Sequence, residues 1–521
     1  MSDPAAAGTL VLAAAAFLAL SWRFGAYLAY ALAAVRYPWE LDYGEGIVAE
    51  QARLLFSGRA YGDITRFPCV VFHYPPLYHL AVRAVAATGA DLIAAGRAVS
   101  LAATLATGGL AAALARLAAG RDADPRAALA SAVVAGLTVF CWFPVVAWSP
   151  MMRVDMLAVA LSLAGVLCAA AAVPRRPWLL HAAAGAFVLA LLTKQTSLAA
   201  PAATAAVLLW AEPGRAARAM LSGLLLGGAA LGVLEWATAG GFLRHTILYN
   251  VNRYSLVAAA EGCLAIVPHL GLVALALAGA AAGWTRFGLA RLLSDPAALR
   301  RDIARDPGAR LLVILAAYAV LATATLAALG KSGSSLNYLI EWACVLSVLV
   351  GCLATHLAEP LVASSTAPGR GGVRLPRPLL ACLAPLMLLA QALVLPASRP
   401  LDPRLGLDEA AGERELAGLA ARIRDAARPV LSDDMVLVLR GGKDVVWEPA
   451  IFAELAATGR WDDRPLVAMI EAHAFAFIVT QGIPGTPFLD ARYPPAVWAA
   501  IAAAYPRAEE HAGRTVRLPS G

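Results

Sequence analysis

Two carboxylates stand close together near the start of the chain. Asp42 and Glu45 are three residues apart in the segment WELDYGEGIVAEQ, so a helical conformation would place them on one face. A carboxylate at an interface can act as a general base toward a hydroxyl group, and a pair of carboxylates can hold a divalent cation. The alternative is that neither carboxylate has a catalytic role, and that the segment is a charged helix N-terminus with a solvated loop. Asp42 and Glu45 are therefore the candidate catalytic carboxylates.

Lysine is rare in this chain, and two of its three lysines fall between apolar runs. Lys194 lies in LLTKQTSL and Lys331 in LGKSGSSLNYLIEW. A cation beside hydroxyl and backbone N–H groups suits a phosphate at the level of lipid headgroups. The alternative for each lysine is a side chain that reaches interfacial lipid on its own. The GKS triplet lacks the upstream glycine of a nucleotide-binding loop, so we do not expect a nucleotide.

A third charged segment, WSPMMRVDML, carries Arg153 and Asp155 beside an apolar run. Ionisable residues at membrane depth indicate function, with a mutual salt bridge between Arg153 and Asp155 as the alternative. Arg153 is a further candidate for phosphate binding. The other candidate substrate contacts share a polar or aromatic side chain near these motifs: His73, Tyr74, Asp155, Asn337, Tyr338 and Glu341.

The composition determines where such residues can be placed. The 521 residues are 60% hydrophobic and 15% charged, whereas an ordinary soluble domain is about 45–50% apolar and about 25% charged. This difference excludes a disordered chain, a fibrous chain and a conventional cytosolic enzyme, and it indicates a polytopic α-helical membrane protein. The net charge of +7 includes no dense Lys/Arg run, so we expect no nucleic-acid partner.

Hydropathy predicts about 11 membrane spans. The apolar runs lie near 8–35, 92–119, 127–147, 154–173, 178–193, 198–211, 219–239, 263–284, 310–329, 339–357 and 378–396. Arginine-rich connectors follow every second run, and the positive-inside rule assigns these connectors to the cytoplasm. The N-terminus is then cytoplasmic, and the candidate residues concentrate on the opposite face.

The chain divides into a membrane domain, residues 1–396, and a small extracytoplasmic α/β domain, residues 397–521. The membrane domain includes a long first external loop, 36–91, in which we expect residues 76–90 to form an interfacial or re-entrant helix. In the C-terminal domain we expect a helix over 408–427 and strands over 430–439, 475–481 and 515–519. Cys69 and Cys263 fall in external segments and could pair, although no spacing demands it, and no Cys or His spacing indicates zinc.

These motifs, in this order, resemble the GT-C superfamily of polyprenyl-phosphate-sugar-dependent glycosyltransferases. The resemblance rests on the acidic first loop, the segment YPPL from Tyr74 to Leu77, the RVD and KQT motifs and the segment SLNYLIE. It is nearest to the bacterial family-39-type enzymes, which include protein O-mannosyltransferases and the lipid A aminoarabinose transferase. The usual Asp-Glu pair is replaced here by Asp-Tyr-Gly-Glu-Gly, so the resemblance leaves open which carboxylate is the base.

The resemblance implies an enzyme of the bacterial cytoplasmic membrane. A sugar would pass from a polyprenyl phosphate to a glycan, lipid or protein acceptor, with inversion at the anomeric carbon. Asp42 or Glu45 would act at the acceptor, while Lys194, Lys331 and Arg153 would bind the donor phosphate. No cofactor is implied with certainty, and a divalent cation stays open. The competing hypotheses are a transporter or lipid flippase, which would place ion ligands at mid-membrane, and an assembly protein with a partner-binding tail.

Overall fold

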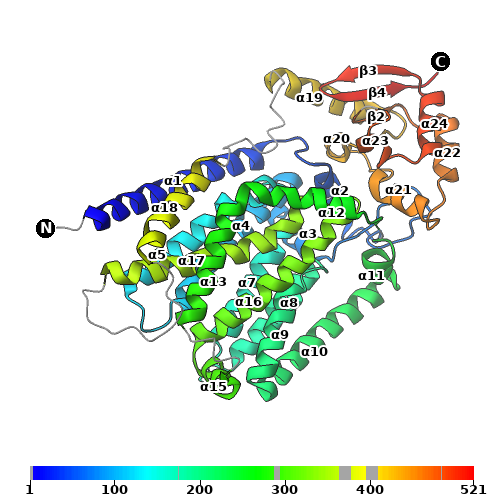
Figure 1. Ribbon diagram of the computed structural model, residues 1–521. Helices are drawn as coiled ribbons and strands as arrows, with labels where there is room; N and C mark the ends of the chain where they lie inside the picture. Colours follow the sequence, from blue (N-terminus) through cyan, green and yellow to red (C-terminus); the bar gives the residue numbers. More distant parts are fainter. Residues whose placement is uncertain are drawn as a thin grey trace.

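The computed structural model describes residues 4–173, 175–250, 252–286, 294–362, 377–394, 409–482 and 484–520. A bundle of long helices forms the body of the molecule, and the strands gather at one end of it, beside α2 (Tyr43–Leu54) and α20 (Met435–Arg440) (Figure 1). The predicted domain boundary after residue 396 lies outside the described residues.

The body consists of α-helices with short 3₁₀ and π segments at several ends. In chain order they are α1 (Pro4–Arg36), α2, α3 (Leu77–Ala86), α4 (Leu92–Ala118), α5 (Pro125–Thr138), η1 (Val139–Cys141), α6 (Phe143–Trp148), α7 (Asp155–Ala171), α8 (Trp178–Thr193), α9 (Ala199–Ala211), α10 (Pro213–Ala237), α11 (Gly241–Leu243), η2 (Arg244–Leu248), α12 (Leu256–Cys263), η3 (Leu264–His269), α13 (Leu270–Arg286), α15 (Pro296–Arg305), α16 (Pro307–Thr325), η4 (Leu326–Gly330), η5 (Leu336–Leu339), α17 (Ile340–Val362) and α18 (Arg377–Val394).

Each of the eleven predicted apolar runs coincides with helical structure. Among the described residues, six helical segments are long and apolar enough to cross a membrane, and several shorter apolar helices accompany them. These helices confirm a polytopic membrane protein, while the number of spans stays a prediction. Residues predicted as an interfacial segment form α3, a helix of ten residues.

Local signals explain where several helices begin. Asp91, Asp124 and Asp306 cap the N-termini of α4, α5 and α16, where each side chain accepts hydrogen bonds from free backbone N–H groups. Pro125 and Pro307 follow two of these caps, at the first helical position, where the missing N–H costs nothing.

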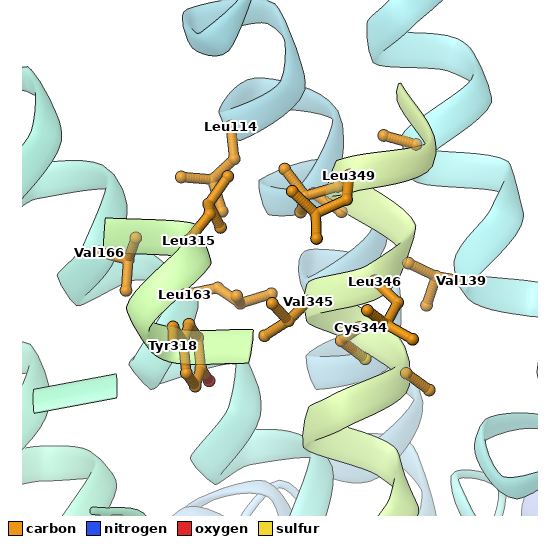
Figure 2. Close-up of a cluster of buried hydrophobic side chains, with 14 of the residues drawn as sticks. Leu114, Val139, Leu163, Val166, Leu315, Tyr318, Cys344, Val345, Leu346 and Leu349 are labelled. Carbon is orange, nitrogen blue, oxygen red and sulfur yellow. The ribbon is translucent and has the colours of Figure 1, made fainter. Parts of the chain in front are cut away.

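Helix α17 lies at the centre of the core. It packs against α5, α13 and α16, and its side chains interdigitate with those of α4 and α7. Figure 2 shows Val345 and Leu349 of α17 facing Leu163 of α7 and Leu114 of α4 across this core. Gly279 of α13 permits close approach, because a Cβ there would lie 1.8 Å from the carbonyl oxygen of Leu349.

One arginine of the predicted cytoplasmic connectors is fully buried. Arg310 at the start of α16 forms an ion pair with Glu212 and donates to the carbonyl groups of Ala172, Ala304 and Ile303. Its N–H groups thus supply hydrogen bonds to carbonyl groups near the ends of helices, which an apolar side chain could not do. This residue ties α7, α9, α15 and α16 together, away from the candidate site.

Residues 409–520 form an α/β unit around a four-stranded sheet. Its elements are α19 (Glu409–Asp425), β1 (Leu431–Ser432), α20, α21 (Pro449–Ala457), α22 (Arg464–Glu471), β2 (Ile478–Thr480), α23 (Pro487–Asp490), α24 (Pro495–Ala504), β3 (Arg507–His511) and β4 (Arg514–Leu518). The strand order is β1-β2-β4-β3, in which β1 and β2 are parallel and the other neighbours antiparallel.

The predicted strand over 430–439 is wrong beyond its first residues. The strand ends at Ser432, and α20 begins at Met435 because Asp434 caps it by accepting the N–H of Leu437 at 2.9 Å. The apolar side chains from Met435 to Val438 are all buried, against α2 as well as against the sheet. Because the segment is buried on all sides, its apolar residues form a continuous run and do not alternate with polar ones. The periodicity of such a run does not distinguish a helix from a strand.

The C-terminal unit and the first external loop share one core. Ile64, Cys69 and Val71 of the loop pack with Trp447 and Trp461 of the unit. Cys69 is buried and Cys263 is exposed, and both are free thiols, so the two do not form a disulfide. The predicted loop 36–91 is therefore a folded layer between the helices and the sheet.

Candidate functional site

Asp42 lies at the N-terminus of α2 rather than within it. Its backbone is extended, with φ −150°, and its carboxylate caps the helix by accepting the N–H of Gly44 at 2.9 Å. This conformation separates Asp42 from Glu45, which occupies the first turn of the helix. The two carboxylates therefore have different surroundings, although their spacing suggested one shared face.

Glu45 is fully buried in a bidentate ion pair with Arg97. The Nε and Nη2 atoms of Arg97 donate to its two oxygens at 2.8 and 2.7 Å. The backbone N–H groups of Leu41 and Met152 donate to the same oxygens. Burial raises the pKa of Glu45, but Arg97 and these N–H groups lower it further, so the pKa lies below its ordinary value. All of this favours a structural role for Glu45.

Arg153 links Asp42 to the membrane helices. Its Nη1 atom lies 3.3 Å from Oδ2 of Asp42, and its guanidinium stacks over Trp148, 4.6 Å from the ring centroid. Gly44 makes this approach possible, because a Cβ there would lie 1.2 Å from Nη1 of Arg153. The Asp42 side chain remains 24% exposed, so part of it is accessible to solvent.

Asp155 pairs with Lys194 and not with its neighbour Arg153. Lys194 Nζ lies 2.6 Å from Oδ1 of Asp155, and Asn337 Nδ2 donates to the same oxygen at 3.2 Å. The indole of Trp148 donates to Oδ2 at 2.8 Å. The chain of contacts from Asp42 through Arg153 and Trp148 thus continues to Asp155 and Lys194.

Lys194 and Lys331 line one cavity of about 320 Å³. Lys194 follows the C-terminus of α8, and its Nζ lies 5.0 Å from the ring centroid of Tyr338. Lys331 follows η4, and within the described part of the chain its Nζ has no ion pair or hydrogen bond. Glu341 of α17 also borders the cavity and accepts the hydroxyl of Tyr318 at 2.7 Å. Two cations and several polar groups therefore face a common space.

The remaining cavity walls supply hydroxyl groups and apolar surface. Thr196 and Ser197 follow Lys194, and Asn337 and Tyr338 stand on the opposite segment η5. The apolar side comes from α7 and α16. Such a mixture can hold an anion at the lysines and orient a polar group beside it.

His73 and Tyr74, in the first external loop, lie close to Gln195, the residue after Lys194. Their rings are 4.2 Å apart, and Gln195 donates to the carbonyl oxygen of His73 at 2.8 Å. Burial lowers the pKa of His73 to about 3, so its imidazole is neutral near pH 7. Burial raises the pKa of Tyr74, whose phenol also lies within the fields of Arg153 and Lys194. Neither residue lines the cavity of the two lysines.

The structure brings together most of the predicted site residues. Asp155, Lys194, Lys331, Asn337, Tyr338 and Glu341 line this cavity. Arg153 does not line it, but stacks on Trp148, which donates to Asp155, and pairs with Asp42. Asp42, Glu45, His73 and Tyr74 lie outside its lining. Sequence reasoning missed Arg97 and Trp148, which hold Glu45 and Asp155. Arg97 carried a signal that was available, since it is an arginine inside an apolar run.

Metal ligands are not gathered at this site. Among the residues that the structure describes, no group of three or more His, Cys, Asp and Glu side chains could hold a metal ion. Asp42, Glu45 and Asp155 each face an arginine or a lysine instead, and Glu341 accepts the hydroxyl of Tyr318.

A second, larger cavity of about 490 Å³ lies between α8, α9 and α10. Its walls are apolar, with Phe187 and Leu191 on α8, Leu208 on α9 and Leu231 on α10. Gln195, the neighbour of Lys194, stands at its border. An apolar space thus begins one residue away from the lysine.

Known structures share this architecture, although no family model and no curated protein matches the sequence. The chain is similar to ArnT from Cupriavidus metallidurans bound to undecaprenyl phosphate, with a TM-score of 0.55 and 15% identity over 94% of this chain and 97% of that one. ArnT in the apo state gives a TM-score of 0.54 at the same identity, over 94% of this chain and 96% of that one. The chain therefore has the fold of ArnT, which agrees with the GT-C fold that the resemblance of its motifs implied.

Proposed function

We propose that this chain is an integral-membrane glycosyltransferase that uses a polyprenyl-phosphate-linked sugar. The observation that carries the proposal is the cavity shared by Lys194 and Lys331, which are far apart in sequence. Polar side chains able to hydrogen-bond a sugar stand in the same walls. A phosphate at the lysines and a sugar toward Asn337 and Glu341 match this distribution of charge.

An apolar surface suited to the donor lipid lies beside the phosphate site. The apolar cavity between α8, α9 and α10 borders Gln195, so an isoprenoid tail there would place its phosphate near Lys194. The similarity to ArnT bound to undecaprenyl phosphate supports the same class of lipid. Arg153 is a third cation, and among the described residues its Nε has no hydrogen-bond partner.

Asp42 is the carboxylate that acts at the acceptor. It is partly exposed, whereas Glu45 and Asp155 are buried and fully engaged by donors. Asp42 accepts the proton of the acceptor hydroxyl or amine as that atom attacks the anomeric carbon. The bond from the anomeric carbon to the phosphate oxygen breaks in the same displacement, so the configuration inverts. The lipid phosphate leaves as an anion that Lys331, Lys194 and Arg153 stabilise.

The site operates at the outer face of a bacterial cytoplasmic membrane. The arginine-rich connectors indicate that the N-terminus is cytoplasmic. The first external loop and the C-terminal α/β unit, which share a core, then both lie outside the cytoplasm. The acceptor, whether a glycan, a lipid or a protein, approaches Asp42 from that side.

Transfer can be tested with the purified 521-residue chain in proteoliposomes. Undecaprenyl-phosphate sugars labelled in the sugar would be supplied with a panel of lipid, glycan and peptide acceptors. We expect labelled acceptor and free undecaprenyl phosphate in equal amounts, from at least one pair. Movement of the labelled lipid across the bilayer without cleavage would instead establish a flippase and overturn the proposal.

A further inference from the structure

The segment that carries Asp42 is held from two directions. On one side Arg153, from the membrane helices, forms its ion pair with Asp42. On the other side the C-terminal α/β unit contacts Glu40, two residues before Asp42, and Tyr43, the residue after it. This second set of contacts has no part in the chemistry described above.

Tyr43, the residue after Asp42, makes the closest contacts with the C-terminal unit. Its hydroxyl donates to Oε1 of Glu448 at 2.6 Å and accepts the N–H of Ala450 at 3.0 Å. The guanidinium of Arg492 lies 3.9 Å from the centroid of its ring. The ring is therefore fixed at its edge and on its face by groups from two helical regions of the unit.

The positions on either side of Tyr43 are tied to the same unit. Glu40 is buried, and its Oε1 accepts Nε2 of Gln481 at 3.1 Å. Gly46 permits direct contact with α20, because a Cβ there would lie 2.6 Å from Cβ of Met435. Three residues within a segment of seven, Glu40, Tyr43 and Gly46, thus contact the unit and fix the position of the first turn of α2.

Asp42 depends on that turn for its own orientation. Its carboxylate caps α2 through Gly44, and its carbonyl oxygen accepts the N–H of Glu45 at 2.9 Å. A shift of Tyr43 would move the cap, and with it the carboxylate that faces Arg153. Displacement of a reacting group by about 1 Å can lower a rate by about 100-fold.

We propose that Tyr43 is a positioning residue through which the C-terminal unit sets the orientation of Asp42. The inference rests on the proposed function for the assignment of Asp42 as the acceptor carboxylate. It gives the C-terminal unit a role in turnover, as the support for the catalytic loop. Glu448 and Arg492 act through Tyr43 and do not touch the substrate.

The test compares Y43F with Y505F in the full-length chain. The hydroxyl of Tyr505 donates to the carbonyl of Phe475 at 3.0 Å inside the C-terminal unit, away from α2. Each variant loses one phenolic hydroxyl that both donates and accepts a hydrogen bond. We expect Y43F to lower kcat about tenfold with an unchanged KM for the donor, because binding of the lipid phosphate does not involve Asp42. Y505F should keep the kcat of the wild type.

A second pair of variants changes the acceptor of the Tyr43 hydroxyl. Glu448 also caps α21, so the unfolding midpoint of each variant is measured to separate positioning from loss of folding. E448Q retains an oxygen that accepts from Tyr43 and should keep most of the kcat, whereas E448A should behave as Y43F. Equal kcat for Y43F and the wild type would overturn the inference.

Hydrogen–deuterium exchange decides the inference without any substrate. In Y43F we expect faster exchange at residues 41–45, where the N–H groups of Leu41, Gly44 and Glu45 are bonded, and no change there in Y505F. Unchanged exchange in Y43F overturns the positioning role. Absence of transfer by the wild type with every donor would instead count against the proposed function alone, because the exchange result still stands.

Discussion

The Nζ atom of Lys194 lies 2.6 Å from an oxygen of Asp155, which is 2% exposed. Trp148 and Asn337 donate to the same carboxylate. The charge of Lys194 is thus balanced within the protein, whereas Lys331 has no such partner among the described residues. The two lysines of the cavity therefore differ in their surroundings, and under the proposed function Lys331 is the cation with its charge available to a donor phosphate.

Substitution of Lys331 by glutamine should weaken donor binding without loss of stability. A hydrogen bond to a charged group contributes about 1.5–3 kcal/mol, so we expect the donor KM to rise at least about tenfold. K443Q is the matched control, because Lys443 donates to Ala426 in the C-terminal unit. Titration of each variant with undecaprenyl phosphate would check this, and equal affinities for K331Q and the wild type would contradict it.

Substitution of Lys194 should instead destabilise the protein. K194Q leaves Asp155 as an uncompensated buried charge, a change that costs about 3–5 kcal/mol. The double variant K194Q/D155N removes both charges and should recover most of the thermal stability, as measured by the unfolding midpoint in detergent. If K194Q unfolds at the temperature of the wild type, the pair is not as tightly coupled as its geometry indicates.

Asp42→Asn should abolish most of the transfer while the fold is kept. Asparagine caps helix N-termini about as well as aspartate, but it cannot accept a proton. Loss of a general base lowers kcat by about 100- to 10,000-fold. D124N is the control, because Asp124 caps α5 away from the site. Full activity of D42N in the labelled-sugar assay would remove Asp42 from the mechanism.

Glu45→Gln should act on stability first. Glutamine cannot balance the buried charge of Arg97, and a broken buried pair costs about 3–5 kcal/mol. We expect a large fall in the unfolding midpoint and activity that declines only with the folded fraction. A stable E45Q protein with no transfer would show that Glu45, rather than Asp42, is the base.

The stability of the C-terminal unit should decrease as the pH rises toward neutrality. Burial raises the pKa of Glu448 to about 7, whereas an unfolded glutamate titrates near about 4.3. The folded state binds this proton more tightly, so its contribution is complete below about pH 4 and is lost as the pH rises through about 7. Between about pH 5 and about pH 8, the unfolding midpoint of E448Q should fall less than that of the wild type. E471Q, at an exposed glutamate, should fall as much as the wild type. Parallel curves for E448Q and the wild type would contradict this.

Hydropathy and charge, which are local properties, determined much of this protein. Apolar runs of sufficient length must be helical in a membrane because every backbone group needs an internal partner. The sequence therefore predicted the helical body, the helix α19 and the strands near 478 and 515. It also predicted that Lys194 and Lys331 would lie on one face.

Tertiary structure decided the roles of individual residues. Asp42 and Glu45 differ because one caps α2 and the other meets Arg97, 52 residues away in sequence. Lys194 and Lys331 share a cavity only because α7, α16 and η5 close around them. Residues 435–440 form a helix that is buried between α2 and the sheet. Each outcome depends on a partner distant in the chain, and the burial and pairing of a charge are determined by such partners and not by its neighbours in sequence.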